Sequence, residues 1–249
     1  MSNPERDHWF EDLADHLGSA YLRYSFTKGT KQEVRFLVEE LELEPGMRVL
    51  DVGCGPGRHA YELAELGIEV HGVDISERFI DIAKAHGPDL ATFERCDARH
   101  LSFEAEFDAV ISLCQGAFGL AAGGQDADNA PLDPDGEVLN GIARALKPGS
   151  KCAVSAFSAY FQVRHIEAMG SEFDALRGVN HEVTTLKDEA GNDTEANLWT
   201  TCFTPRELRL LSVQAGLKPI DIWSVTPGRY GREVPSVDSE EFLLVAQRP

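Results

Sequence analysis

From Arg48 onward, short apolar runs rich in β-branched residues alternate with longer stretches whose apolar residues recur at helical spacing. The short runs favour strands and the longer ones favour amphipathic helices. Alternation of this kind is typical of βαβ units and a mostly parallel sheet. The strands are expected at 47–52, 68–73, 91–95, 107–113 and 151–157, with helices at 57–66, 76–86 and 135–146.

The first 44 residues stand outside this alternation. They are expected to form helices with a break near 28–30, and their second half has an apolar side that includes Phe36 and Leu37. Because no strand pattern occurs there, we expect 1–44 to be a helical cap or lid on a domain that occupies 45–249.

An insert of about 158–203 interrupts the alternation a second time. Its strands are expected at 181–187 and 195–203, joined by a polar turn at Gly191 and Asn192, which makes the insert a two-stranded ribbon. A helix and two strands complete the predicted order, at 205–215, 217–225 and 241–247.

The chain has 42 acidic and 23 basic residues among 249, a formal charge of −19. Nucleic acids and anionic membranes attract basic faces, so neither is expected as a partner. No apolar run approaches the roughly 18 residues of a transmembrane helix, and the chain begins with charged residues where a signal peptide would be apolar. We therefore expect a cytoplasmic protein. The five cysteines form no C-x-x-C pair, so neither a disulfide framework nor a metal site is expected.

The most informative stretch runs from Val49 to Gly57, where an apolar strand is followed at once by Gly53, Gly55 and Gly57. Alternating glycines permit a tight turn and let a ligand approach the backbone without meeting a Cβ. The helix that begins beyond them presents free amide hydrogens, which favour an anionic group. A glycine-rich turn without any ligand is the purely structural alternative.

The spacing around this loop indicates the kind of ligand. In a dinucleotide site the third glycine falls one residue later, at the position that Arg58 occupies here. The second strand ends in Asp74, 21 residues beyond Gly53, where a carboxylate can accept both ribose hydroxyls. The spacing favours a nucleoside without a pyrophosphate over NAD, although an isolated Asp after a strand also serves often as a helix cap.

Several segments together resemble class I S-adenosylmethionine-dependent methyltransferases in order and spacing. Besides the glycine loop they are Gly72–Ser76, Cys96–Ala98, Phe107–Ile111, Leu146–Gly149, Phe203–Thr204 and Ala215–Leu217. The resemblance covers about 45–249 and leaves the first 44 residues and the insert outside. It implies a Rossmann-like α/β fold with a seven-stranded, mostly parallel sheet, an antiparallel last strand and helices on both faces.

The resemblance also implies S-adenosylmethionine as cofactor and gives roles to the loop after the first strand. Gly53, Cys54, Gly55 and Gly57 would pass beneath the methionine part and the ribose. Asp51 would steady this loop or meet the amino group of the cofactor through water.

Further roles fall on the ends of the next strands. Asp74 would hold the ribose diol and Ile75 would flank the adenine. Asp97 would accept from the exocyclic amine of adenine, and Ala98 would offer its backbone amide to the ring. The end of the fourth strand, Leu113 to Gln115, would face the sulfonium and the acceptor.

The implied activity is methyl transfer to an oxygen or nitrogen of a small-molecule acceptor. Because a sulfonium is itself a strong methyl donor, positioning is expected to be the protein's main contribution, and no catalytic residue stands out. The weak candidates for a general base are His59, His165, His181 and Tyr24, each of which also suits a packing or surface role. Further candidates are Tyr21, Tyr160, Glu182 and Tyr230.

The insert is expected to cover the acceptor, since ligands bind beyond the carboxyl ends of parallel strands. Its apolar residues, such as Tyr160, Phe161 and Trp199, suit an acceptor pocket, and they equally suit the insert's own core or a homodimer face. Two other functions stay open: a methyltransferase that acts on tRNA or protein, and an S-adenosylmethionine-binding protein that does not methylate.

Overall fold

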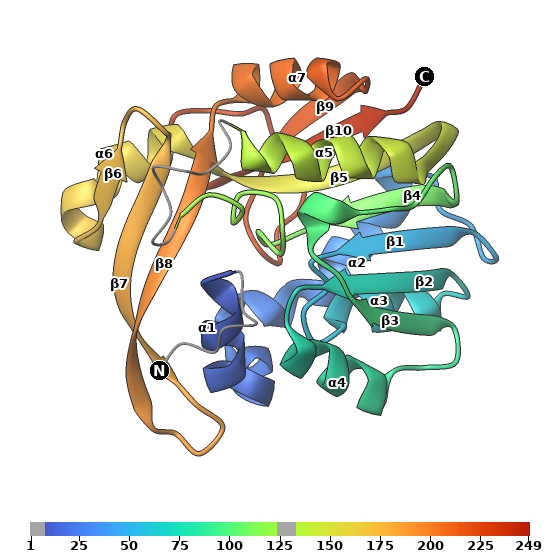
Figure 1. Cartoon of the computed structure of the whole chain (residues 1–249). Helices are drawn as coiled ribbons and strands as arrows, with labels where there is room; N and C mark the ends of the chain where they lie inside the picture. The colour runs from blue at the N-terminus through green and yellow to red at the C-terminus, as the bar shows by residue number, and fades with distance from the viewer. Residues whose placement is uncertain (1–7, 124–132) are drawn as a thin grey trace.

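The computed structural model describes residues 8–123 and 133–249, and its framework is an open α/β sheet (Figure 1). Five strands run parallel in the order β3-β2-β1-β4-β5, and β10 lies antiparallel between β5 and β9. This arrangement confirms the expected sheet and its antiparallel last strand. The bounds are β1 Arg48–Val52, β2 Glu69–Asp74, β3 Ala91–Arg95, β4 Phe107–Ser112, β5 Leu146–Ser158, β9 Lys218–Val225 and β10 Glu241–Gln247.

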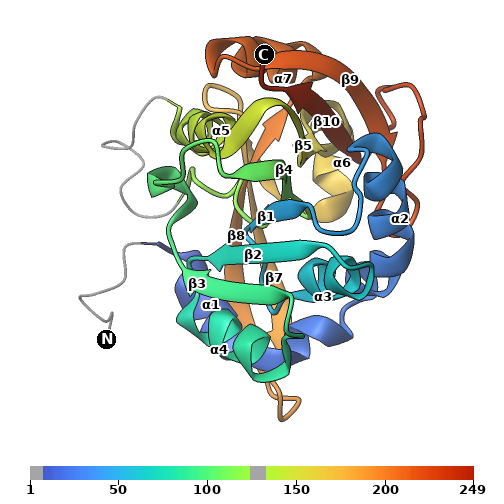
Figure 2. The same ribbon diagram turned by 90° about the vertical axis from the view of Figure 1, so that its right-hand side faces the viewer.

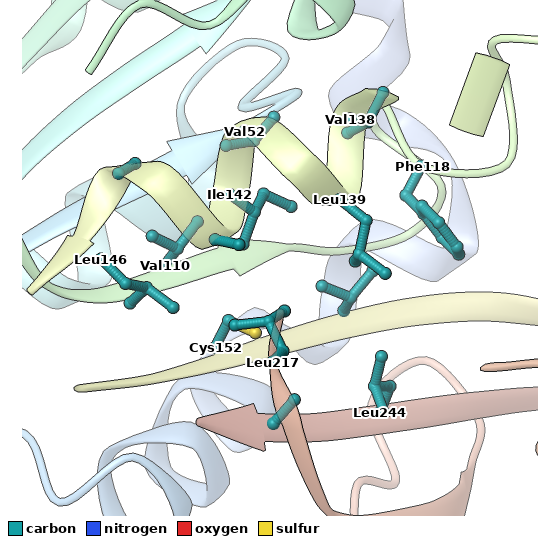
Figure 3. Close-up of a cluster of buried hydrophobic side chains, with 14 of the residues drawn as sticks. Val52, Val110, Phe118, Val138, Leu139, Ile142, Leu146, Cys152, Leu217 and Leu244 are labelled. Carbon is teal, nitrogen blue, oxygen red and sulfur yellow. The ribbon is translucent and has the colours of Figure 1, made fainter. Parts of the chain in front are cut away.

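Helices cover both faces of the sheet, as expected (Figure 2). One buried cluster joins α2, α3 and α4 to the strands, and Leu37, Leu63 and Ile80 belong to it. The other joins α5 and α7 to the opposite face through residues such as Leu139 and Ile142 (Figure 3). The bounds are α2 Thr30–Glu40, α3 Arg58–Glu65, α4 Glu77–His86, α5 Pro134–Ala145 and α7 Pro205–Gln214. Because the central strands are parallel, their carboxyl ends share one edge, and the loops that follow them meet there.

The N-terminal segment lies at that edge and not on a face of the sheet (Figure 1). It consists of α1 Phe10–Leu17 and two 3₁₀ helices, η1 Gly18–Arg23 and η2 Ser25–Gly29, before α2 begins at Thr30. The break is therefore longer than the expected one near 28–30. Within the described ranges, no helix has the length and apolar character needed to cross a membrane.

The insert differs from the expected two-stranded ribbon. Its main hairpin, β7 Val179–Lys187 and β8 Asp193–Phe203, turns at Asp188–Asn192, where the Asp188 amide donates to the Asn192 carbonyl at 3.0 Å. The insert also contains α6 Ala159–Met169 and a short strand, β6 Glu172–Asp174, which pairs with β7. Neither element is predicted from the sequence. The apolar residues of α6, which include the exposed Val163 and Met169, do not mark one buried face, and β6 has only three residues.

The insert extends the sheet beyond its seven-stranded framework. β8 pairs in parallel with the end of β5, at Phe157 with Cys202 and Ser158 with Phe203. The long hairpin then passes the carboxyl edge of the central strands and reaches the N-terminal segment (Figure 1). The N-terminal segment and the insert therefore enclose the edge at which the strand-end loops meet.

Candidate cofactor and acceptor site

A pocket opens at the carboxyl ends of β1, β2 and β3. Loops after four strands, helix α5 and the N-terminal segment from His8 onward contribute to its walls. It is lined by His8, Phe10, Gly53, Asp74, Ile75, Cys96, Asp97, Ala98, Arg99, Gly116, Ala117, Leu120, Ala121 and Val138. Five residues singled out in the sequence, Gly53, Asp74, Ile75, Asp97 and Ala98, are thus brought together in one pocket.

The glycine loop has the backbone that its sequence predicts. Gly53, Gly55 and Gly57 have φ angles of 75°, 53° and 86°, in the region that favours glycine. The amides of Gly53 and Cys54 both donate to the Val73 carbonyl, at 2.8 and 3.0 Å, and so tie the loop to β2. A Cβ on Gly53 would lie 2.1 Å from the carbonyl carbon of Gly116, so the loops after β1 and β4 approach each other as only glycines permit.

Asp74 is buried and organises the turn beside the glycine loop. Its Oδ2 accepts from the Gly55 amide at 2.9 Å and its Oδ1 from the Ser76 amide at 2.8 Å. Burial raises the pKa of Asp74 to about 6, and these two hydrogen bonds partly offset the rise. Each carboxylate oxygen keeps a second lone pair that can accept from a hydroxyl of a ligand.

Asp97 combines the helix-cap role with a place in the pocket wall. It caps η3, Ala98–His100, by accepting from the Arg99 amide at 2.9 Å, and the Arg99 guanidinium binds the same carboxylate. Burial alone would raise the pKa of Asp97, but the hydrogen bonds and charge of Arg99 lower it overall. Asp97 is therefore a charged acceptor at pH 7.

Asp51, on β1 directly before the glycine loop, is 1% exposed, and its Oδ2 has no hydrogen-bond partner. Burial raises the pKa of this carboxyl group to about 7; the charge of Arg58 opposes the rise and that of Asp74 adds to it. A buried carboxylate oxygen without a donor is rare. An ammonium group of a ligand would supply the missing donor.

The remaining residues expected at the cofactor are not in the pocket lining. The side chains of Cys54 and Leu113 are buried in the core cluster on the α2–α3 face. Gly55 lies beneath the Tyr21 ring, whose nearest atom would be 3.8 Å from a Cβ there. Gly57 caps α3 in the left-handed conformation, and Gln115 is buried on the loop after β4.

His59 takes part in a buried ion network that no pattern in the sequence indicates. Glu33 Oε2 accepts from both Arg58 Nη1 and His59 Nε2, each at 2.7 Å, and Glu33 Oε1 accepts from the Gly228 amide at 2.8 Å. Burial would raise the pKa of Glu33, but His59 and Arg58 lower it to about 2. Burial, together with Arg58, lowers the pKa of His59 to about 4, so its imidazole is neutral and donates to Glu33. The network joins α2, α3 and the loop before β10.

The other base candidates lie on the cap and the insert. Tyr24 Oη accepts from the Lys187 amide at 3.2 Å, so it binds the β7–β8 hairpin. The His181 ring stacks on Trp199 at 5.0 Å on the same hairpin, and the His165 ring packs on Phe161 of α6. None of these side chains belongs to the pocket lining.

Tyr21, in the N-terminal segment, lies beside the glycine loop at Gly55 but is not part of the pocket lining. Burial raises its pKa, to which the charges of Cys114, Asp74 and Asp51 add, while that of Arg58 opposes the rise. In the sequence Tyr21 is a base candidate because it precedes a predicted turn, and helical spacing alone does not distinguish it from Tyr24.

A buried carboxylate on α5 holds the loop after β4 in place. Asp135 Oδ1 accepts from the amides of Gly119, at 2.7 Å, and Ala121, at 3.3 Å, and its Oδ2 accepts from the Thr201 hydroxyl at 2.7 Å. Burial raises the pKa of Asp135 to about 6, against these hydrogen bonds. The loop is thus attached both to α5 and to the insert strand β8.

Comparison with known proteins assigns the chain to a family. The model of a methyltransferase domain matches residues 43–204. The chain is 31% identical over 219 residues to a cypemycin N-terminal methyltransferase from a Streptomyces species, which covers 82% of this chain and 84% of that protein. It is 30% identical over 152 residues to a ubiquinone biosynthesis O-methyltransferase from Xanthomonas oryzae, 57% of each chain.

Solved structures agree with the fold. The CcbJ methyltransferase from Streptomyces caelestis is 20% identical, with 96% of each chain covered and a TM-score of 0.72. At that identity the likeness concerns the architecture alone. Together with the matched domain and the 31% identical relative, it leads to one conclusion: this chain is a member of the class I S-adenosylmethionine-dependent methyltransferases.

Proposed function

We propose that this protein binds S-adenosylmethionine in the described pocket and transfers its methyl group to a nitrogen or oxygen of a small-molecule acceptor. One observation carries the proposal: an unpartnered buried carboxylate oxygen on Asp51 stands beside a glycine loop and an Asp74-lined pocket. These features match the parts of that cofactor. The Asp51 carboxylate suits its ammonium group, the Asp74 carboxylate suits its ribose diol, and the glycine loop between them provides a wall without Cβ atoms. When bound, it supplies an electrophilic methyl group on a positively charged sulfur.

Different residues of the pocket bind the ribose and the adenine of the cofactor. Asp74 accepts from the ribose hydroxyls through its free lone pairs. Ile75 and Ala98 flank the adenine, and Asp97 accepts from its exocyclic amine, beside the Arg99 guanidinium that holds the carboxylate in place. Ala98 contributes its backbone amide to the ring.

The methionine part lies along the glycine loop. Gly53, Cys54, Gly55 and Gly57 form its backbone floor, and Asp51 binds the ammonium group. Leu113 shapes the floor from the core, and Gln115 lies on the side toward the acceptor.

Positioning is the main chemical contribution of the chain. Holding the acceptor atom in line with the methyl group can account for roughly 7 to 11 kcal/mol of the barrier. The enclosing cap and insert exclude water. Of the earlier base candidates, we assign His59 to the Glu33 network and Tyr24, His165 and His181 to packing of the cap and insert.

A peptide acceptor is the second candidate, because the 31% identical relative is named a cypemycin N-terminal methyltransferase.

The excess of 19 negative charges disfavours tRNA as the acceptor. The test is a turnover assay in which the purified chain and S-adenosylmethionine are incubated with a small-metabolite fraction, a peptide fraction or tRNA. The proposal predicts S-adenosylhomocysteine formation with the metabolite fraction, and formation with tRNA alone would contradict it.

A further inference from the structure

A second group of buried polar side chains lies at the same sheet edge, outside the pocket lining. Glu241 opens β10 and pairs in register with Phe157 at the end of β5. Gln115 follows β4, which is the parallel neighbour of β5. Tyr230 comes from the loop before β10, and its ring packs against Phe36 of α2 at 6.1 Å. Three segments distant in sequence thus bring polar groups to one place.

Each of these side chains has a polar atom without a partner. Glu241 Oε2, Gln115 Nε2 and Tyr230 Oη are buried and make no hydrogen bond, in residues that are 5%, 6% and 4% exposed. Buried polar atoms are nearly always hydrogen bonded. Gln115 Nε2 can donate to the Glu241 carboxylate, whose pKa a hydrogen bond from Gln115 lowers. The partners that a ligand has to supply are therefore those of Glu241 Oε2 and Tyr230 Oη.

The groups lie within electrostatic range of one another. The charge of Glu241 contributes to the raised pKa of Tyr230 and of the Cys114 thiol, after the larger effect of burial. The side chain of Gln115 lies beside Glu241 and lowers its pKa, against burial that raises it to about 7. They therefore form one cluster, which we call the Glu241 cluster: Glu241, Gln115 and Tyr230.

The carboxylate of this cluster lacks a cation of its own. The charged groups that act on Glu241 are Glu33 on α2, Glu240 directly before β10 and Arg58 on α3. Of these described groups only Arg58 is positive, and it is already bound to Glu33 at 2.7 Å. A positively charged ligand group would complement the cluster, whereas an anion would be repelled.

The backbone beside the cluster is held in an unfavourable conformation. Cys114 and Gln115 have φ angles of 51° and 50°, in the left-handed region that residues with a Cβ rarely adopt. Strain of this kind concentrates at binding and catalytic sites. The loop with this strain is the one that passes Gly53 at the pocket, so the cluster adjoins the methionine end of the proposed cofactor site.

We infer that the Glu241 cluster binds the ammonium group of the methyl acceptor, which makes the acceptor an amine. The inference rests on the proposed methyl transfer and names its substrate class. Glu241 Oε2 accepts one ammonium hydrogen and Tyr230 Oη accepts another, while Gln115 Nε2 donates to the carboxylate.

The same carboxylate prepares the nitrogen for reaction. Glu241 takes a proton from R–NH₃⁺ and leaves R–NH₂ with a free electron pair. The N–C bond then forms as the C–S bond breaks, and the electron pair of the broken bond stays on sulfur. The product leaves as the methylated ammonium, and Glu241 releases its proton to water, so that each turnover yields one proton.

The test uses methylammonium as the probe, with the full chain saturated with S-adenosylhomocysteine at pH 8. Thermal unfolding is followed while methylammonium chloride replaces sodium chloride at constant ionic strength, and the rise in Tm gives an apparent Kd. The wild-type Tm should rise. Glu241→Gln should weaken the apparent Kd at least tenfold and Tyr230→Phe should weaken it less, whereas Glu240→Gln, a change at the exposed neighbour, should alter it less than twofold.

The outcomes separate the two proposals. If methylammonium does not raise the Tm of the wild type, the cluster holds only water and the amine site is overturned. An equal effect in Glu241→Gln and the wild type overturns it as well. Binding of S-adenosylhomocysteine is measured first by calorimetry, and its absence would instead refute the cofactor site.

Discussion

Asp51→Asn should stabilise the cofactor-free protein and weaken cofactor binding at the same time. Burial raises the pKa of Asp51 from 3.8 to about 7, and each pKa unit is worth about 1.4 kcal/mol. The folded state therefore holds this proton more tightly than the unfolded chain, so stability falls as the pH rises from about 4 to about 7 and then stays level. Above pH 7 the buried charge costs about 4 kcal/mol, which asparagine does not incur.

The assay is urea unfolding of the cofactor-free protein at pH 5 and pH 8, with the exposed Asp81→Asn as control. The stability gain of Asp51→Asn should be larger at pH 8 by about 3 kcal/mol, equivalent to roughly 6 to 12 °C in Tm. Calorimetry should give a 10- to 100-fold weaker affinity for S-adenosylmethionine, since a charge-assisted hydrogen bond is worth about 1.5 to 3 kcal/mol. Equal stability gains at both pH values would refute the raised pKa of Asp51, and unchanged affinity would refute its assignment to the ammonium group.

Three further changes probe the surroundings of the pocket. Gly53→Ala places a Cβ 2.1 Å from the Gly116 carbonyl carbon, in a residue with φ of 75°. Calorimetry should therefore detect at least a tenfold loss of cofactor affinity. Unchanged affinity would show that the loops after β1 and β4 can separate without cost. Thr201→Val leaves Asp135 Oδ2 without its donor and should lower the unfolding free energy by about 1 to 3 kcal/mol at pH 7.5. The loss should be smaller at pH 5, where Asp135 is protonated. Urea titrations at both pH values measure it, and equal losses would contradict the prediction. Glu189→Ala removes the carboxylate that accepts from the Ser19 amide of η1 and from Arg78 of α4. It should speed exchange of the Ser19 amide hydrogen, and an unchanged exchange rate would contradict the role of this contact.

The glycine loop and the position of Asp74 in the pocket were predictable because their signals are local. The glycine loop needs left-handed backbone at Gly53, Gly55 and Gly57, and such positions are visible as glycines in the sequence. Asp74 follows a recognisable strand, and its hydrogen bonds reach only Gly55 and Ser76. Sequence patterns detect interactions of this range well.

The Glu33 network and Glu241 were not predictable because their residues meet only through the tertiary fold, whereas Gln115 and Tyr230 are among the candidates that the sequence offers. Glu33 bonds to Arg58, 25 residues away, and to the amide of Gly228, 195 residues away. In the sequence, Arg58 is distinctive only because it occupies the position of the third glycine of a dinucleotide site. Glu241 is the first residue of β10, and the groups around it are set by the position of β10 between β5 and β9. The residues next to Glu241 in the sequence do not indicate that position.

Isothermal titration with S-adenosylhomocysteine tests the assignment of the cofactor site most directly. The wild type and the exposed control Asp81→Ala should bind one equivalent with the same affinity. Asp74→Ala should lose at least tenfold, because it removes the proposed acceptor for the ribose diol and the partner of the Gly55 amide. Absence of binding by the wild type, or binding by Asp74→Ala as tight as that of the wild type, would contradict the site described for this protein.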